Sequence, residues 1–168
     1  MNGPRPIGLR LAGLEAMSAL NDGWSDNWLW SVPLIVLTVL VHGFGLVGIR
    51  ERVIGGLTDT LGARSSRAAF AVVIAATVLL LTGLHALEGA AWAFAYVALG
   101  ASADPRIAML YSLSAMTSYG HAEIFLAPHW RMMGALEALN GMMLFGLSTA
   151  FLFSVLSSHW PVHTHGGR

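Results

Sequence analysis

The sequence predicts an all-α integral membrane protein with three transmembrane helices and a short re-entrant segment between the last two. Of its 168 residues, 55% are hydrophobic and only 11% are charged, whereas soluble domains carry roughly 25% charged residues. Three apolar stretches are long enough to cross a bilayer, which takes about 20 residues of helix. A single membrane domain therefore uses nearly the whole chain and leaves no room for a separate soluble domain.

The first part of the chain is predicted to contain a surface segment, one span and a basic loop. Residues 1–30 mix apolar with charged positions and end in three tryptophans, a pattern typical of an interfacial helix that leads into an aromatic belt. Residues 31–49 carry no formal charge and form the first transmembrane helix. Residues 50–67 hold four arginines, which predicts a cytoplasmic loop because short arginine-rich loops stay on that side.

Two further apolar stretches follow. Residues 68–100 would make about 50 Å of helix, more than one hydrocarbon thickness. Residues 132–156 contain one carboxylate, Glu137, near their beginning. With three spans, the N-terminus is expected outside and the C-terminus in the cytoplasm, and the expected location is the bacterial inner (cytoplasmic) membrane. Residues 158–168 are expected to be a flexible tail. The tail contains three histidines, which are only weak evidence of a metal site in a short polar terminus.

The segment between the last two spans is too short to cross the membrane. Pro105 can start a helix, and residues 106–116 are apolar enough to be buried. Such a stretch beside membrane spans is typical of a re-entrant segment, whose irregular return must be shielded by protein or line water. The return is TSYGHAEI, residues 117–124.

The order of helix, short helix, glycine-containing loop and helix resembles the pore module of tetrameric potassium channels. The filter pattern of that family, F-S-L-V-T-F-T-T-L-G-Y-G-D, aligns without a gap with YSLSAMTSYGHAE, residues 111–123. The helix in residues 130–153 is similar to the inner helix of bacterial two-span channel-like proteins. The preceding helix adds four residues at helical spacing: His85, Glu88, Trp92 and Tyr96. The resemblance covers residues 68–157.

The resemblance implies a homotetramer with a re-entrant pore helix and a filter-like loop that conducts monovalent cations. Seven residues take the filter and pore positions: Thr117, Ser118, Tyr119, Gly120, His121, Ala122 and Glu123. Ala122 stands where the family has its second glycine, and His121 stands where it has tyrosine, so strict potassium selectivity is not expected. Glu123 keeps a carboxylate, and a ring of four would favour cations. His121 is expected to set either the selectivity or a response to pH.

Other polar residues in the spans have candidate roles. His85 and Glu88 share a helix face with Trp92, and we expect this face to support the filter from behind. The alternative is a metal site made of His85, Glu88 and His121, for which two ligands at helical spacing are a weak signal. Glu137 is assigned to the same support, through an ion pair with Arg131 or Arg106 or through a tie to the loop. Asn140 and Ser148 lie nearly on one face. They either line a central cavity or form interhelical hydrogen bonds.

Three functions remain open on the sequence alone. The first is a passive cation channel, and the second is a non-conducting pore-loop scaffold or accessory subunit. The third, a metal or haem protein, would use His42 and His85. The chain has no cysteine and no signature of a catalytic nucleophile, so an enzyme is not expected. No cofactor, bound metal or nucleic-acid partner is predicted.

Overall fold

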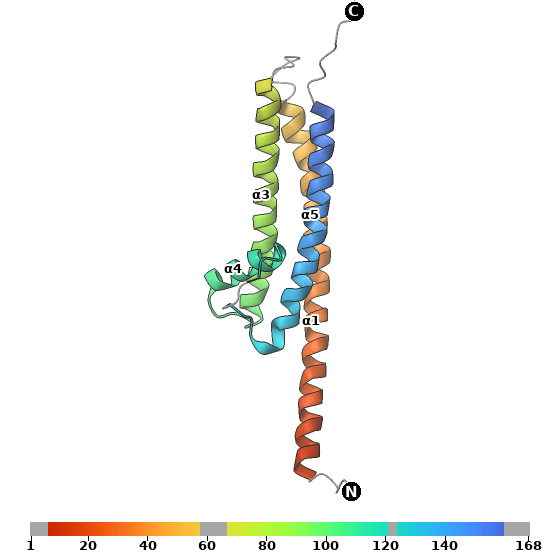
Figure 1. Cartoon of the computed structure of the whole chain (residues 1–168), viewed down its shortest axis with the longest axis vertical. Helices are drawn as coiled ribbons and strands as arrows, with labels where there is room; N and C mark the ends of the chain where they lie inside the picture. Colours follow the sequence, from red (N-terminus) through yellow and green to blue (C-terminus); the bar gives the residue numbers. More distant parts are fainter. Residues whose placement is uncertain (1–6, 58–66, 121–123, 160–168) are drawn as a thin grey trace, which may run out of the picture.

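The computed structural model describes residues 7–57, 67–120 and 124–159, and the regular structure in these ranges is helical. Helix α1 (Ile7–Gly48) continues into the π-helix η1 (Ile49–Ile54), and α3 (Arg67–Ala98) runs antiparallel to α1 and α5 (Arg131–His159) (Figure 1). The short helix α4 (Pro105–Met116) and the 3-10 turn η2 (Pro128–Trp130) connect α3 to α5. The start of α1 and the end of α5 lie at opposite ends of the molecule.

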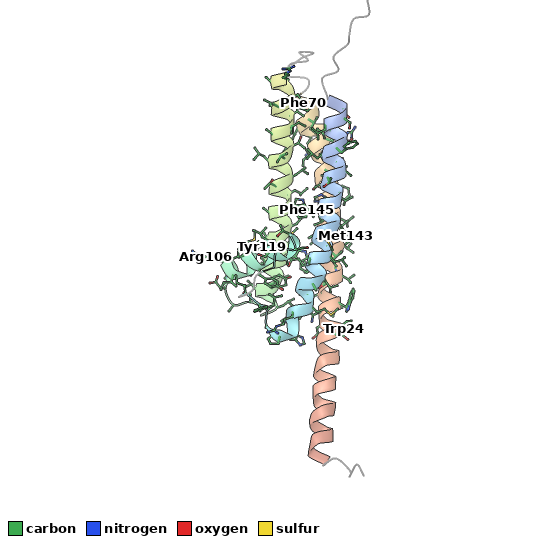
Figure 2. The ribbon with its side chains drawn as sticks, viewed as in Figure 1. Trp24, Phe70, Arg106, Tyr119, Met143 and Phe145 are labelled. Carbon is green, nitrogen blue, oxygen red and sulfur yellow. The ribbon has the colours of Figure 1, made fainter. Side chains whose placement is uncertain are left out.

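Three helices are long and apolar enough to cross a membrane: Gly23–Leu57, Arg67–Ala98 and Pro128–Ser158. Large apolar side chains face outward along all three, and Phe44, Leu79 and Phe153 are 74%, 72% and 71% exposed. Figure 2 shows such side chains from the level of Trp24 to that of Phe70 at the other end of the bundle. A soluble protein does not expose apolar surface on this scale. For the described residues, the prediction of an all-helical fold with three helices able to span a membrane is therefore confirmed.

The helical structure that contains the first span extends beyond the predicted residues 31–49 at both ends. The chain was expected to change from a surface segment to a span near residue 30, but one helix runs from Ile7 to Gly48 without a break. Helical structure also continues through residues 50–57, which were assigned to the loop. Charged residues do not end a helix by themselves, and each added residue extends it at low cost once it has formed.

The core consists of two apolar clusters at different levels of the bundle. Near α4, the cluster is centred on Trp92, Tyr96 and Met133. The other cluster contains five residues near the opposite end: Ile49, Ile54, Val73, Leu81 and Val155. Buried polar side chains lie along the helices between these clusters: Thr38, His42, Glu88, Asn140 and Ser148. These polar residues are the starting point for the functional site.

Side chains complete the hydrogen bonding at two helix starts. Asp104 caps α4 by accepting a hydrogen bond from the backbone N–H of Arg106 at 2.7 Å, with Pro105 in the first turn. The predicted helix start at Pro105 is thus confirmed. At α5, the Oδ1 of Asn27 accepts from the N–H of Met133 at 2.7 Å. Because the first N–H groups of a helix have no partner within it, Asn27 fastens α1 to the start of α5.

Candidate functional site

Two glycines allow α4 to end deep against the long helices. A β-carbon at Gly141 of α5 would overlap the carbonyl group of Met116, the last residue of α4. At Gly89 of α3 it would lie 3.2 Å from the Leu113 side chain. Gly141 lies ten residues after Arg131, where α5 begins, and so about 15 Å along the helix. The C-terminal end of α4 therefore lies beside α3 and α5 at a level between the two ends of these helices (Figure 1).

The loop after α4 adopts an unusual backbone conformation. Ser118 and Gly120 have φ angles of 55° and 65°, in the left-handed region. Glycine adopts that region freely, as expected for Gly120, but serine pays about 1–2 kcal/mol. The N–H groups of Ser118 and Tyr119 donate to the carbonyls of Ala115 and Ser114 at 2.9 and 3.0 Å, which holds the turn against α4. Residues 121–123, with His121, Ala122 and Glu123, lie outside the described residues.

The described part of the loop is open to its surroundings. Thr117, Ser118 and Gly120 are exposed, and the Tyr119 side chain is 77% exposed at the loop end of α4 (Figure 2). Beside the loop lies a groove of about 420 Å³, formed with the start of α5. Its walls include Tyr111, Ser118, Ile124, Phe125, Arg131 and Ala135. A single chain thus leaves the loop and the adjoining groove uncovered.

Glu137 connects the three elements around the loop. Its carboxylate is fully buried and accepts hydrogen bonds from the Tyr96 hydroxyl of α3 and the Ser112 hydroxyl of α4. The Ser112 oxygen also lies 2.8 Å from the carbonyl oxygen of Gly89. Among the described residues, these hydrogen-bond partners of Glu137 are hydroxyls of α3 and α4, and they include neither Arg131 nor Arg106 nor a residue of the loop.

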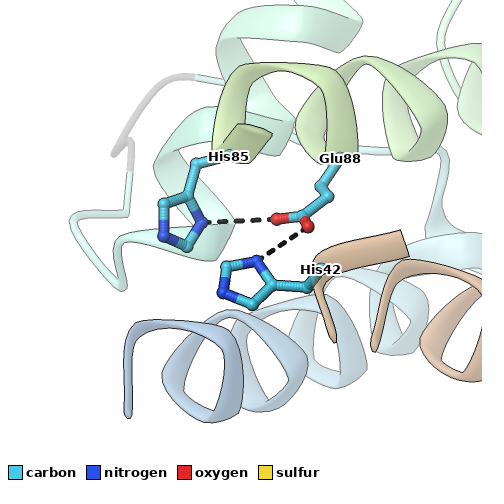
Figure 3. A group of neighbouring side chains, drawn as sticks. All are labelled: His42, His85 and Glu88. Atoms are coloured by element: carbon cyan, nitrogen blue, oxygen red, sulfur yellow. Dashed lines mark hydrogen bonds and ion pairs between the residues drawn. The ribbon is translucent and has the colours of Figure 1, made fainter. Parts of the chain in front are cut away.

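A second buried cluster joins all three long helices. His42 Nδ1 lies 2.9 Å from Glu88 Oε1, and His85 Nδ1 lies 3.4 Å from Glu88 Oε2 (Figure 3). On the far side of both rings, Ser148 Oγ lies 3.1 Å from His42 Nε2 and 3.0 Å from His85 Nε2. The side chains of His42 and Glu88 are 0% exposed, and that of His85 is 14% exposed. The four residues form a closed polar ring inside the bundle.

The remaining predicted site residues are buried within the chain. Trp92 packs in the apolar cluster beside Tyr96. The Asn140 side chain donates to Thr38 Oγ1 of α1 at 2.8 Å, and Ser148 belongs to the ring with the two histidines. For Asn140 and Ser148 this arrangement favours interhelical hydrogen bonds over the cavity-lining role. The hydrogen bonds and ion pairs of His85 and Glu88 join them to His42 and Ser148, and none of these contacts involves the described part of the loop.

Several partners in these clusters were not predicted. Ser112 and Thr38 were not singled out, and Tyr96 and Ser148 were given other roles. His42 was considered only as a metal or haem ligand. The signal available for His42 was its place inside a span, where an ionisable residue needs a partner. No comparable signal marks Ser112, because a hydroxyl on a short helix is common on any surface.

The comparisons with known proteins do not distinguish between the candidate functions. No protein-family model, curated protein or solved structure matches this chain. What the chain does must therefore be inferred from its own residues and their geometry.

Proposed function

We propose that this chain forms a passive cation-conducting pore as a homotetramer in the lipid bilayer, with residues 117–123 lining its narrowest part. The observation that carries the proposal is the exposed turn at Ser118 and Gly120, which follows α4 deep inside the length of α5. That the pore has four copies and conducts monovalent cations is inferred from the resemblance to potassium channels. It also implies that α4 is a re-entrant pore helix.

The physics of the bilayer supports an assembly around this loop. Irregular backbone with unpaired polar groups is not found facing lipid, because each unsatisfied group costs several kcal/mol there. It persists at such depth only where protein covers it or water reaches it. The exposed loop of one chain meets both conditions when several copies turn their loops toward a common axis.

The residues of the loop suit cation passage. Backbone carbonyls and the hydroxyls of Thr117 and Ser118 are neutral oxygen groups of the kind that replace an ion's hydration shell in selectivity filters. A ring of Glu123 carboxylates would raise the local concentration of cations. Ala122 and His121 differ from the potassium-channel pattern, and for this reason we propose a pore without strict potassium selectivity.

The buried carboxylate of Glu137 would hold the pore helix of such a pore in position. It joins α3, α4 and α5 through the hydroxyls of Tyr96 and Ser112. A pore helix must hold its loop at a fixed distance from the axis, and these hydrogen bonds fix α4 between the two spans. Glu137 acts here as a positioning residue and does not contact the permeating ion.

The main alternative is a non-conducting pore-loop scaffold or accessory subunit. The replacements at His121 and Ala122 favour it, because they change two positions on which the potassium-channel filter depends. A haem held between His42 and His85 fits poorly. The centroids of the two rings lie 5.1 Å apart, and both rings contact Ser148, which leaves no space for a porphyrin between them.

Flux measurements separate these functions. The purified chain is reconstituted in liposomes, and potassium and sodium uptake are compared with those of a His121→Ala, Glu123→Ala double variant. A cation pore gives flux that the double variant alters. Absence of flux from wild-type protein that is folded and tetrameric would reject the pore in favour of the scaffold. Identical flux from both proteins would mean that residues 121 and 123 do not line the path.

A further inference from the structure

We propose that His42, His85 and Glu88 form a binding site for a divalent transition-metal ion. Each residue offers one ligand atom, and these atoms lie within 4.8 Å of one another. Two imidazoles and one carboxylate suit zinc and iron(II) better than magnesium or calcium, which prefer oxygen ligands. The site lies apart from the loop, so the inference does not rest on the proposed pore.

Two atoms of the cluster are buried without a hydrogen-bond partner. They are His85 Nδ1 and Glu88 Oε2, which face each other at 3.4 Å. Buried polar atoms are nearly always paired, and leaving one unpaired costs about 1–3 kcal/mol. An unpaired nitrogen and an unpaired carboxylate oxygen that face one another are the partners expected around a cation.

Counting protons shows why two neutral histidines and an ionised Glu88 do not satisfy the ring. If His42 Nδ1–H donates to Glu88, its Nε2 has a lone pair that must accept the one proton of Ser148 Oγ. Ser148 can then only accept from His85, which places the second proton on His85 Nε2. His85 Nδ1 is left with a bare lone pair directed at the negative carboxylate. This repulsion is relieved when a positive charge lies between the two groups.

A metal ion on the Glu88 side satisfies the carboxylate and both histidines. Each histidine would coordinate through Nδ1 and carry its proton on Nε2. Both N–H groups would then donate to the two lone pairs of Ser148 Oγ, at the observed 3.1 and 3.0 Å. Metal-bound histidines typically have such an outer partner, which fixes the ring orientation. An open fourth position would accept water or hydroxide, and hydroxide would balance the excess positive charge.

The position of the site suggests a structural effect of the ion. His42 belongs to α1, and His85 and Glu88 belong to α3. Ser148 belongs to α5 and lies seven residues beyond Gly141, about 10 Å further along the helix. Binding would therefore tie all three spans together beyond the level at which α4 ends. We expect the loaded protein to resist thermal unfolding better than the chelated protein.

The test uses the full chain in detergent, with His159, His163 and His165 changed to glutamine so that the tail does not bind metal. After chelation, Co²⁺ is titrated as the probe. Its visible absorption reports bound ligands, and elemental analysis gives the stoichiometry. We expect one Co²⁺ per chain.

The variants test which residues bind the ion. Glu88→Gln or His42→Gln should weaken Co²⁺ binding at least 100-fold, and Ser148→Ala about 10- to 100-fold. His129→Gln, which changes an exposed histidine paired with Asp26, is the matched control.

Several results would overturn the site. One is the absence of stoichiometric Co²⁺ binding by folded protein that has Ser148 and the three ligands intact. In that case a proton between His85 and Glu88, and not a metal ion, relieves the repulsion in the ring. Another is binding that survives Glu88→Gln or that falls equally with His129→Gln. Helix content and elution volume are checked for each variant. If the ligand variants do not fold, two other results test the site. These are the number of Co²⁺ ions bound per parent chain and the loss of Co²⁺ affinity in Ser148→Ala.

Discussion

At Gly141 the backbone of α5 lies so close to the carbonyl group of Met116 that no side chain fits between them. Gly146, five residues later on the same helix, has no neighbour within 4 Å of the place where a β-carbon would stand. Glycine is common in membrane helices, and the sequence does not distinguish these two positions. The structure assigns a packing role to the first and leaves the second open, which makes the pair a matched experiment.

Gly141→Ala should push the end of α4 away from α5. Overpacking of this kind costs about 1–3 kcal/mol, and we expect a lower unfolding temperature in detergent together with reduced cation flux in liposomes. Gly146→Ala should leave both quantities unchanged or raise the stability slightly, because alanine is the better helix former. Equal behaviour of the two variants would show that α4 does not pack against Gly141.

His121 leads to a second prediction at the scale of the residue. The unperturbed pKa of histidine is about 6.5, so acidification from about pH 8 to about pH 5 adds a positive charge to the ring. In a pore lined by His121 this charge repels cations, and flux should fall several-fold as the pH is lowered. The pH dependence should disappear in His121→Gln and persist in His129→Gln. A response to pH that is the same in both variants would remove His121 from the path.

At the scale of the element, α4 is a short helix held by groups from both neighbours. Helices of 12 residues are marginal on their own in water, so packing must stabilise this one. Its contacts include Gly89 and Gly141 at its end and the Glu137 carboxylate near its middle. The hydrogen bond from Ser112 to Glu137 is buried, where the loss of one partner leaves the other unsatisfied.

Glu137→Ala should therefore loosen α4 more than the rest of the bundle. The variant leaves the Tyr96 hydroxyl without its acceptor, at a cost of about 1–3 kcal/mol. It also removes the tie between α4 and α5 at Ser112, whose hydroxyl then has only the Gly89 carbonyl oxygen of α3, 2.8 Å away. Hydrogen exchange should be faster for the amides of α4, with little change in residues 31–49 of α1. Glu137→Gln keeps an acceptor oxygen and should show a smaller effect. Glu51→Gln, at an exposed position of η1, is the control for a lost carboxylate. Unchanged exchange in α4 would mean that Glu137 does not hold it.

At the scale of the whole molecule, three long helices present apolar side chains outward while the loop after α4 exposes polar backbone. The two kinds of surface require different environments. The apolar faces fit lipid, and the loop fits water or another protein surface. A chain on its own in the bilayer leaves this conflict unresolved, and the proposed tetramer would resolve it by turning the loops toward a common axis.

Cysteine labelling tests this arrangement directly, because the chain has no cysteine of its own. Thr117→Cys should react with a charged, membrane-impermeant thiol reagent in liposomes, since the loop would line water. Leu79→Cys should not react, because this side chain is exposed on the apolar surface of α3. A reactive Leu79→Cys or an unreactive Thr117→Cys would contradict the proposed environment of the loop.

The elements of this protein follow from local features of the sequence. Long apolar stretches predict the spans because the length and polarity of each can be assessed without its neighbours. The start of α4 follows from Asp104 and Pro105, which act within one helical turn. The continuous helical structure through residues 7–30 and 50–57 was not predicted, because charged residues indicate where a helix leaves lipid and not where it ends.

The partners of the buried polar groups depend on how the helices are rotated and aligned against one another. The spacing of His85 and Glu88 places them on one face of α3, and one sequence can establish that much. It does not establish that this face meets His42 of α1 and Ser148 of α5, because these residues are separated along the chain and meet only when the bundle packs. Glu137 obtains its hydroxyl partners for the same reason. Composition and periodicity determine the helices and the membrane, whereas helix packing determines which polar groups form a site.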